Sequence, residues 1–223
     1  METVQTDIDL KRKIELGPPE KEFPDRPLLI LAHGAGNDMF APFMMEISRR
    51  IESYRLNVLR FNFPYKTAGR KMPDSQKILE LAWRSAIDWA ADNLKFEGLF
   101  IGGKSLGARI ASMIAGDISG LSGLVFLGYP LHPPGRYDNR RDEHLYRLKL
   151  PMLFIQGSND AFAKIDLLLE VVEKLKPFVS SHFIEEGDHS YRVPAKSGRK
   201  YEDILAEAGD VAARWIMEIW GNK

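Results

Sequence analysis

Short runs of apolar residues recur along this chain, each bounded by glycine, proline or asparagine. The runs cover residues 28–33, 57–63, 99–103, 124–128, 152–157 and 182–185. Their apolar positions are continuous rather than alternating, which is typical of strands buried on both faces of a parallel sheet. The pattern therefore predicts the strands of a mostly parallel sheet.

Between these runs lie segments in which apolar residues recur at helical spacing. The clearest are residues 78–90, which follow a start signal at Pro73 and Asp74, and residues 204–219 near the end of the chain. This alternation predicts an α/β domain with three layers, a sheet between two layers of helices. The polar residues 1–26 predict an extended edge or hairpin. We see no repeat or linker, so we expect residues 1–223 to form a single domain.

Composition narrows the classes of function. Lys and Arg number 31, and Asp and Glu also number 31, so net charge favours neither nucleic acid nor an anionic membrane. No apolar run approaches the length of about 20 residues that a membrane span needs, and no signal peptide is visible. The absence of cysteine excludes thiol catalysis and Cys-bound zinc. We expect a cytoplasmic protein that binds neither nucleic acid nor membrane, and the sequence indicates no oligomeric state.

One serine lies where a predicted strand meets a predicted helix. Residues 103–107 read GKSLG, which matches the G-x-S-x-G nucleophile elbow. Glycine is needed at both ends because a side chain there would crowd the sharp turn that lifts the serine above the sheet edge. The motif directly follows the run at 99–102 and precedes good helix-forming residues at 108–114. Ser105 is therefore the candidate nucleophile.

The same segment also satisfies the phosphate-binding pattern G-x-x-x-x-G-K-[ST], from Gly98 to Ser105. In a P-loop, the four residues between the glycines form a loop around the phosphate. Here those residues are LFIG at 99–102, and the polar residues 92–97 would have to form the preceding buried strand. Nucleotide binding is therefore a remote alternative, and Lys104 is more simply a side chain beside the elbow.

A serine hydroxyl is a poor nucleophile unless a base takes its proton and a carboxylate orients that base. In proteins with this elbow, the acid and then the histidine follow the serine along the chain. Asp160 and His189 each come just after a late predicted strand. Because parallel strands end at one edge of a sheet, we predict that Ser105, Asp160 and His189 form a catalytic triad.

Other residues fit these roles less well. Asp188 and Glu185 remain second choices for the orienting carboxylate, since a residue adjacent to the histidine rarely reaches its distal nitrogen. His132 also follows a strand end, yet it precedes the acid candidate in the chain. None of the 5 histidines shows the spacing of a metal site, so we predict no bound metal.

Two further features of this edge concern the substrate. Residues 33–36, HGAG, follow the first predicted strand, so we expect the N–H groups of Ala35 and Leu106 to form an oxyanion hole. The irregular stretches 64–73 and 130–141 also follow strand ends and are candidate pocket walls. The candidate substrate-pocket residues are histidines and aromatic residues near this edge, namely His33, Tyr65, Tyr129, His132, Phe162 and Tyr191.

From residue 28 to residue 220 the sequence resembles the α/β-hydrolase superfamily. The segments LAHGAG at 31–36, GGKSLG at 102–107 and FLGYPLHPPG at 126–135 are similar to a compact dienelactone-hydrolase-like branch. Eukaryotic relatives in that branch include testis-expressed protein thirty and subunit three of the nonspecific lethal chromatin complex. The resemblance implies an α/β-hydrolase fold with a minimal lid, a Ser-Asp-His triad and no cofactor. The branch also includes members with no established enzymatic activity.

These features together predict a serine hydrolase that cleaves a small ester or thioester through an acyl-enzyme intermediate. Ser105 would attack the carbonyl with His189 as base, so activity should rise with pH through a pKa near that of free histidine, about 6.5. The short predicted connections favour a small or surface-accessible substrate. The alternative from another class is a non-catalytic scaffold that uses the hydrolase fold as a binding surface.

Overall fold

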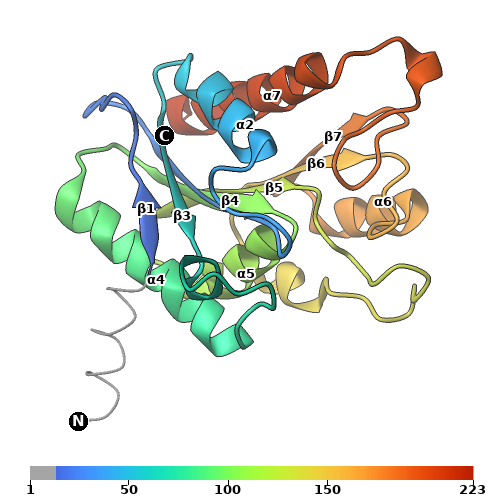
Figure 1. The fold of residues 1–223 in the computed structure, drawn as a ribbon, viewed down its shortest axis with the longest axis horizontal. Helices are drawn as coiled ribbons and strands as arrows, with labels where there is room; N and C mark the ends of the chain where they lie inside the picture. The colour runs from blue at the N-terminus through green and yellow to red at the C-terminus, as the bar shows by residue number, and fades with distance from the viewer. Residues whose placement is uncertain (1–13, 223) are drawn as a thin grey trace.

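A computed structural model describes residues 14–222 of the protein. Within them, 7 strands form one sheet in the order β1-β3-β2-β4-β5-β6-β7 (Figure 1). The strands are β1 (Glu15–Gly17), β2 (Leu28–Ala32), β3 (Asn57–Asn62), β4 (Leu99–Lys104), β5 (Leu121–Leu127), β6 (Met152–Gly157) and β7 (Val179–Ile184). β1 lies antiparallel to β3, and every other neighbouring pair is parallel. The mostly parallel sheet predicted from the hydrophobic runs is thus confirmed.

Helices cover both faces of this sheet. In Figure 1, α2 (Pro42–Glu52) and α7 (Tyr201–Gly221) lie above it, and α4 (Gln76–Asn93), α5 (Leu106–Ile114) and α6 (Ile165–Leu175) lie below it. The helices expected over residues 78–90 and 204–219 are the central parts of α4 and α7. The remaining helical turns are short: α3 (Pro64–Thr67), η1 (Ala115–Asp117), η2 (Glu143–Arg147) and η3 (Ala195–Ser197).

The two layers of helices explain why the strands read as continuous apolar runs. In β2, Leu28 and Ile30 face the apolar cluster that includes α4, α5 and α6. Leu29 and Leu31 face a second cluster, formed with α2 and α7. Because successive side chains of a strand point to opposite faces, both sets must be apolar when both faces are covered.

The structure changes the predicted strand limits at two places. β5 begins at Leu121 and β7 at Val179, ahead of the apolar runs at 124–128 and 182–185. β7 is an edge strand, and Ser180 and Ser181 within it are exposed, so its first half carries no apolar run. At the opposite edge, β1 confirms part of the extended segment expected within residues 1–26, and residues 1–13 lie outside the described part.

The long connection from β5 to β6 is anchored to the domain in its second half. It contains η2, which packs against both α5 and α6. Among residues 14–222, no helix is both long enough and apolar enough to cross a lipid bilayer.

Candidate active site

Ser105 lies at a sharp turn between the end of β4 and the start of α5. Its backbone has φ 51° and ψ −107°, a region that residues other than glycine rarely adopt. A Cβ on Gly103 would lie 2.1 Å from the Ala32 carbonyl oxygen, and a Cβ on Gly107 would lie 2.3 Å from the same oxygen. Both glycines of the motif are therefore required by the close approach of β2, and the turn leaves the Ser105 side chain half-buried at the sheet edge.

The phosphate-binding interpretation of this segment does not hold. Residues 99–102 are buried in β4 and pair with β2 on one side and β5 on the other. A P-loop needs these residues to wrap phosphate with free backbone N–H groups. Because β4 is the central strand of the sheet, the backbone N–H groups of these residues take part in the hydrogen bonding between strands.

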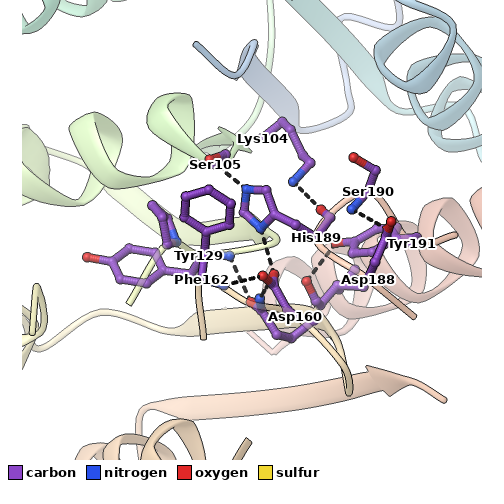
Figure 2. Close-up of polar contacts among 12 residues, drawn as sticks. Lys104, Ser105, Tyr129, Asp160, Phe162, Asp188, His189, Ser190 and Tyr191 are labelled. Atoms are coloured by element: carbon purple, nitrogen blue, oxygen red, sulfur yellow. Dashed lines mark hydrogen bonds and ion pairs between the residues drawn. The ribbon is translucent and has the colours of Figure 1, made fainter. Parts of the chain in front are cut away.

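The structure brings the three predicted catalytic residues together (Figure 2). Ser105 Oγ lies 2.8 Å from His189 Nε2, and His189 Nδ1 lies 2.6 Å from Asp160 Oδ2. Ser105 follows β4, Asp160 follows β6, and His189 lies in the loop after β7. These residues are far apart in sequence but close in space, because the carboxyl ends of parallel strands lie at one edge of the sheet.

Asp160 is held in a fixed orientation. Its side chain is 0% exposed, and Oδ1 accepts a hydrogen bond from the Phe162 N–H at 2.7 Å. Oδ2 accepts from the Gln156 side-chain amide as well as facing His189. A buried carboxylate with these partners can hold the imidazole in one tautomer, with the proton on Nδ1 and the lone pair of Nε2 directed at Ser105.

The surroundings of His189 favour its neutral form. Burial is the main cause that lowers the pKa of His189, and the nearby charge of Lys104 lowers it further, against the opposing effect of Asp160. The Phe162 ring packs beside the imidazole, with 4.4 Å between ring centroids. A neutral imidazole next to a serine hydroxyl can accept its proton.

The second-choice carboxylates have other positions. Asp188 Oδ1 accepts hydrogen bonds from the backbone N–H groups of Ser190 and Arg192 and so shapes the loop that carries His189. Glu185 is exposed. Asp160 is the carboxylate that contacts the imidazole.

The predicted oxyanion donors flank the elbow. Leu106 is the first residue of α5, and Ala35 lies in the loop after β2. A Cβ on Gly34 would lie 3.6 Å from Ser105 Cβ, so this loop packs against the nucleophile. Within residues 14–222 neither the Leu106 N–H nor the Ala35 N–H has a hydrogen-bond acceptor. Tyr65 steadies the loop, because its hydroxyl donates to the Ala35 carbonyl oxygen at 3.0 Å.

Most of the predicted substrate-pocket residues do not line a surface pocket. The ones that are 0% exposed are His33, Tyr65, Tyr129, His132 and Tyr191. Only Phe162 is partly exposed, beside His189. The expectation is corrected for the five buried side chains.

The physical reason is that these five side chains anchor loops from inside. Tyr129 and Tyr191 donate their hydroxyls to the backbone carbonyls of Arg141 and Ile155. The ring nitrogens of the two histidines bond to loop backbone atoms, His33 to Gly34 O and Phe63 N and His132 to Pro133 O and Lys164 N. A side chain with a large apolar body and one polar group is well suited to burial when that group finds a partner.

Two residues support the triad in ways that the sequence motifs do not predict. Gln156 is buried, and its side chain makes two hydrogen bonds. Its amide nitrogen donates to Asp160 Oδ2, and its Oε1 accepts from the Tyr129 N–H at 2.8 Å. A glutamine in an otherwise apolar strand is the signal that could have identified it. Lys104 is only 6% exposed, and its Nζ donates to the His189 carbonyl oxygen, which no pattern in the sequence indicates.

Lys104 lies in an unusual environment for a cation. Its Nζ is 5.5 Å from the Phe43 ring centroid and 5.9 Å from that of Tyr191. Burial lowers the pKa of Lys104 to about 8, although the charges of Asp160 and Asp188 oppose the shift. On its outer side the residue borders a cavity of about 150 Å³.

The residues of the site offer no set of metal ligands. Across residues 14–222, no group of 3 or more His, Cys, Asp and Glu side chains is arranged to hold a metal ion. The hydroxyl, imidazole and carboxylate that do lie in contact are a set suited to proton transfer and nucleophilic attack.

Comparison with solved structures supports the fold. The chain is similar to Est1E from Butyrivibrio proteoclasticus, in a structure with bound ferulic acid, at 12% identity and a TM-score of 0.71, covering 92% of this chain and 94% of that one. It is similar to a dienelactone hydrolase from Anabaena variabilis at 18% identity and a TM-score of 0.70, covering 92% and 90%. A serine hydrolase without a lid from Xanthomonas campestris matches at 19% identity and a TM-score of 0.67, covering 91% and 88%.

At these identities the structural likeness shows the fold alone. The resemblance to testis-expressed protein thirty and to subunit three of the nonspecific lethal complex stays a prediction. The sequence itself matches a family model described as an alpha/beta hydrolase domain over residues 25–217. That match spans the whole sheet except β1 and includes the elbow, the Asp160 turn and the His189 loop. The chain therefore belongs to the α/β-hydrolase family.

Proposed function

We propose that this protein is a serine hydrolase that cleaves a small ester or thioester. The observation that carries the proposal is the continuous chain of contacts from Ser105 Oγ to His189 Nε2 at 2.8 Å and from His189 Nδ1 to Asp160 at 2.6 Å. The three residues come from separate loops at one sheet edge, and their contacts follow the order nucleophile, base and orienting carboxylate.

The reaction has two halves. In the first, Ser105 Oγ attacks the substrate carbonyl carbon while His189 Nε2 takes the hydroxyl proton. The Ala35 and Leu106 N–H groups stabilise the negative oxygen of the tetrahedral intermediate. His189 then gives the proton to the departing alkoxide or thiolate, which leaves an acyl-enzyme on Ser105.

In the second half, water replaces the alcohol or thiol. His189 takes a proton from the water as its oxygen attacks the acyl carbon, and a second tetrahedral intermediate forms in the same place. Its collapse releases the carboxylic acid, and His189 returns the proton to Ser105 Oγ. Asp160 stabilises the imidazolium in both halves without itself taking the proton.

Labelling with a fluorophosphonate probe tests the proposal directly. Wild type should be labelled, and Ser105→Ala should not, because phosphonylation needs the activated hydroxyl. Ser53→Ala is a matched control, since Ser53 is an exposed helix-end serine that donates to the Arg50 carbonyl oxygen. A folded wild type that resists labelling, or equal labelling of Ser105→Ala, would overturn the proposal and favour a scaffold.

A further inference from the structure

A second cavity lies between α5 and the η2 segment. It has a volume of about 530 Å³ and is lined by Arg109 and Met113 from α5 and by residues of the 139–147 segment. None of the triad residues lines it. The backbone N–H of Arg109 donates to the Ser105 carbonyl oxygen at 3.0 Å, so this cavity begins about one helical turn from the elbow.

Four arginines line this cavity, and two of them already have carboxylate partners. Arg140 contacts Asp142 at 2.8 Å and Glu170 at 2.9 Å. Arg147 contacts Glu143 at 3.4 Å. Their charges are balanced by the protein itself.

The other two arginines, Arg109 and Arg141, have no carboxylate partner within residues 14–222. Arg109 Nε is buried and lacks any hydrogen-bond partner. Arg141 makes a single long side-chain contact, 3.5 Å to the Pro130 carbonyl oxygen. Both side chains are half-buried, so two unpaired guanidinium groups border one cavity.

The two charges border the same cavity and act on each other and on its wall. Burial and the charge of Arg109 both lower the pKa of Arg141. Burial and the same Arg109 charge also lower the pKa of His144, another residue of the cavity wall. Like charges that are partly removed from water and form no ion pair are costly for the folded state. A bound anion would offset that cost.

We infer that this cavity binds the phosphate group of a small phosphate monoester between Arg109 and Arg141. A monoester carries close to two negative charges at pH 8, because its second pKa is about 6. That charge matches two unpaired guanidinium groups, whose planar donors fit phosphate oxygens in pairs. The cavity is far larger than a phosphate group and includes the apolar Met113, which leaves room for the organic part of the ligand.

Calorimetric titration at pH 8 and constant ionic strength tests this site, with inorganic phosphate and phenyl phosphate as probes. Wild type should bind both, and phenyl phosphate more tightly because its ring has apolar surface to contact. Arg109→Gln and Arg141→Gln should each weaken binding by at least about tenfold, since each removes charge-assisted hydrogen bonds.

Two control variants test whether the anion binds in this cavity. Arg84→Gln should bind like wild type, because Arg84 is an arginine of α4 that pairs with Asp117 outside the cavity. Ser105→Ala should also bind like wild type, since the triad does not line the cavity. Thermal melting should show that Arg109→Gln is as stable as wild type or more so, because Arg109 forms no ion pair that the substitution could break.

The inference is overturned if chloride at the same ionic strength accounts for the whole effect of phosphate. It is also overturned if both arginine variants bind like wild type, or if Ser105→Ala alone abolishes binding, which would place the anion at the triad. If inorganic phosphate binds and phenyl phosphate does not, a monoester is excluded as the ligand.

Discussion

At the scale of single residues, His189 determines how activity should depend on pH. The base must be neutral to accept the Ser105 proton, and burial lowers its pKa below the usual value. The midpoint of the acid limb in the profile of kcat/KM against pH should therefore lie below 6.5. Activity should be lost as the pH drops through the lowered pKa of His189. The structure thus shifts the expectation drawn from free histidine. Rates on p-nitrophenyl acetate from pH 4 to 9 measure it, and an inflection above 6.5 would contradict it.

Asp160→Asn tests the orientation of the imidazole. Gln156 and His189 both contact Oδ2, and the Phe162 N–H donates to Oδ1. An asparagine amide group in place of Oδ2 would donate to His189 Nδ1 instead of accepting from it. The histidine would then favour the wrong tautomer, and kcat should fall by roughly 10³- to 10⁴-fold. Steady-state kinetics with unchanged circular dichroism would show it, whereas a loss of less than about tenfold would argue for another orienting group.

Lys104 acts on the same histidine from the other side, as a positioning residue. Lys104→Met keeps the length of the side chain but removes the donor to the His189 carbonyl oxygen, so kcat should fall about tenfold. It also removes a charge that lowers the pKa of His189, so the acid limb should move to higher pH.

The alkaline side of the profile gives a second readout for Lys104. Because burial lowers its pKa to about 8, wild type should lose activity as the ammonium deprotonates above that pH, and Lys104→Met should lack this decline. A merely structural role would lower the rate without moving either limb. Profiles that superimpose after scaling would therefore refute the positioning role.

At the scale of elements, the elbow depends on how closely β4, α5 and β2 approach. Gly107→Ala would bring a methyl group to 2.3 Å from the Ala32 carbonyl oxygen. We expect a loss of about 1–3 kcal/mol in unfolding free energy, or no folded protein, because backbone and not a flexible side chain must give way. Gly116→Ala is the matched control, since its Cβ would meet only Leu148 Cδ2 at 3.6 Å. Urea unfolding distinguishes the two, and equal stability would contradict the packing argument.

The elements also show where hydrophobic pattern is informative. Strands such as β2 and β4, covered on both faces, are found from their continuous apolar runs. β7 is different because it is the last strand of the sheet and pairs on one side only. Ser180 and Ser181 near its start are exposed to solvent. A half-exposed strand start has no apolar run to reveal it, so its limit follows only from its pairing with β6.

At the scale of the whole molecule, the connections around the elbow bear on substrate size. The β5–β6 connection is held down by contacts of η2 with α5 and α6, and Tyr129 anchors its start through the Arg141 carbonyl oxygen. Among the large apolar side chains of this connection, Tyr137 alone is substantially exposed, which leaves little apolar surface for a long acyl chain, so kcat/KM should fall steadily from p-nitrophenyl acetate to the palmitate. A maximum at long chains would contradict the proposed preference.

Local sequence patterns were enough to predict most of the elements and the order of the chemical groups. Local periodicity and the G-x-S-x-G pattern are properties of neighbouring residues, so they identified the strands, the elbow and the ordered Asp160 and His189. Which aromatic residues become buried loop anchors, as Tyr65 and Tyr191 do, was decided by tertiary structure. So was the contact of Lys104 with the His189 carbonyl oxygen, 85 residues away. Burial and long-range hydrogen bonding depend on which segments the folded sheet brings together, and no local pattern encodes that.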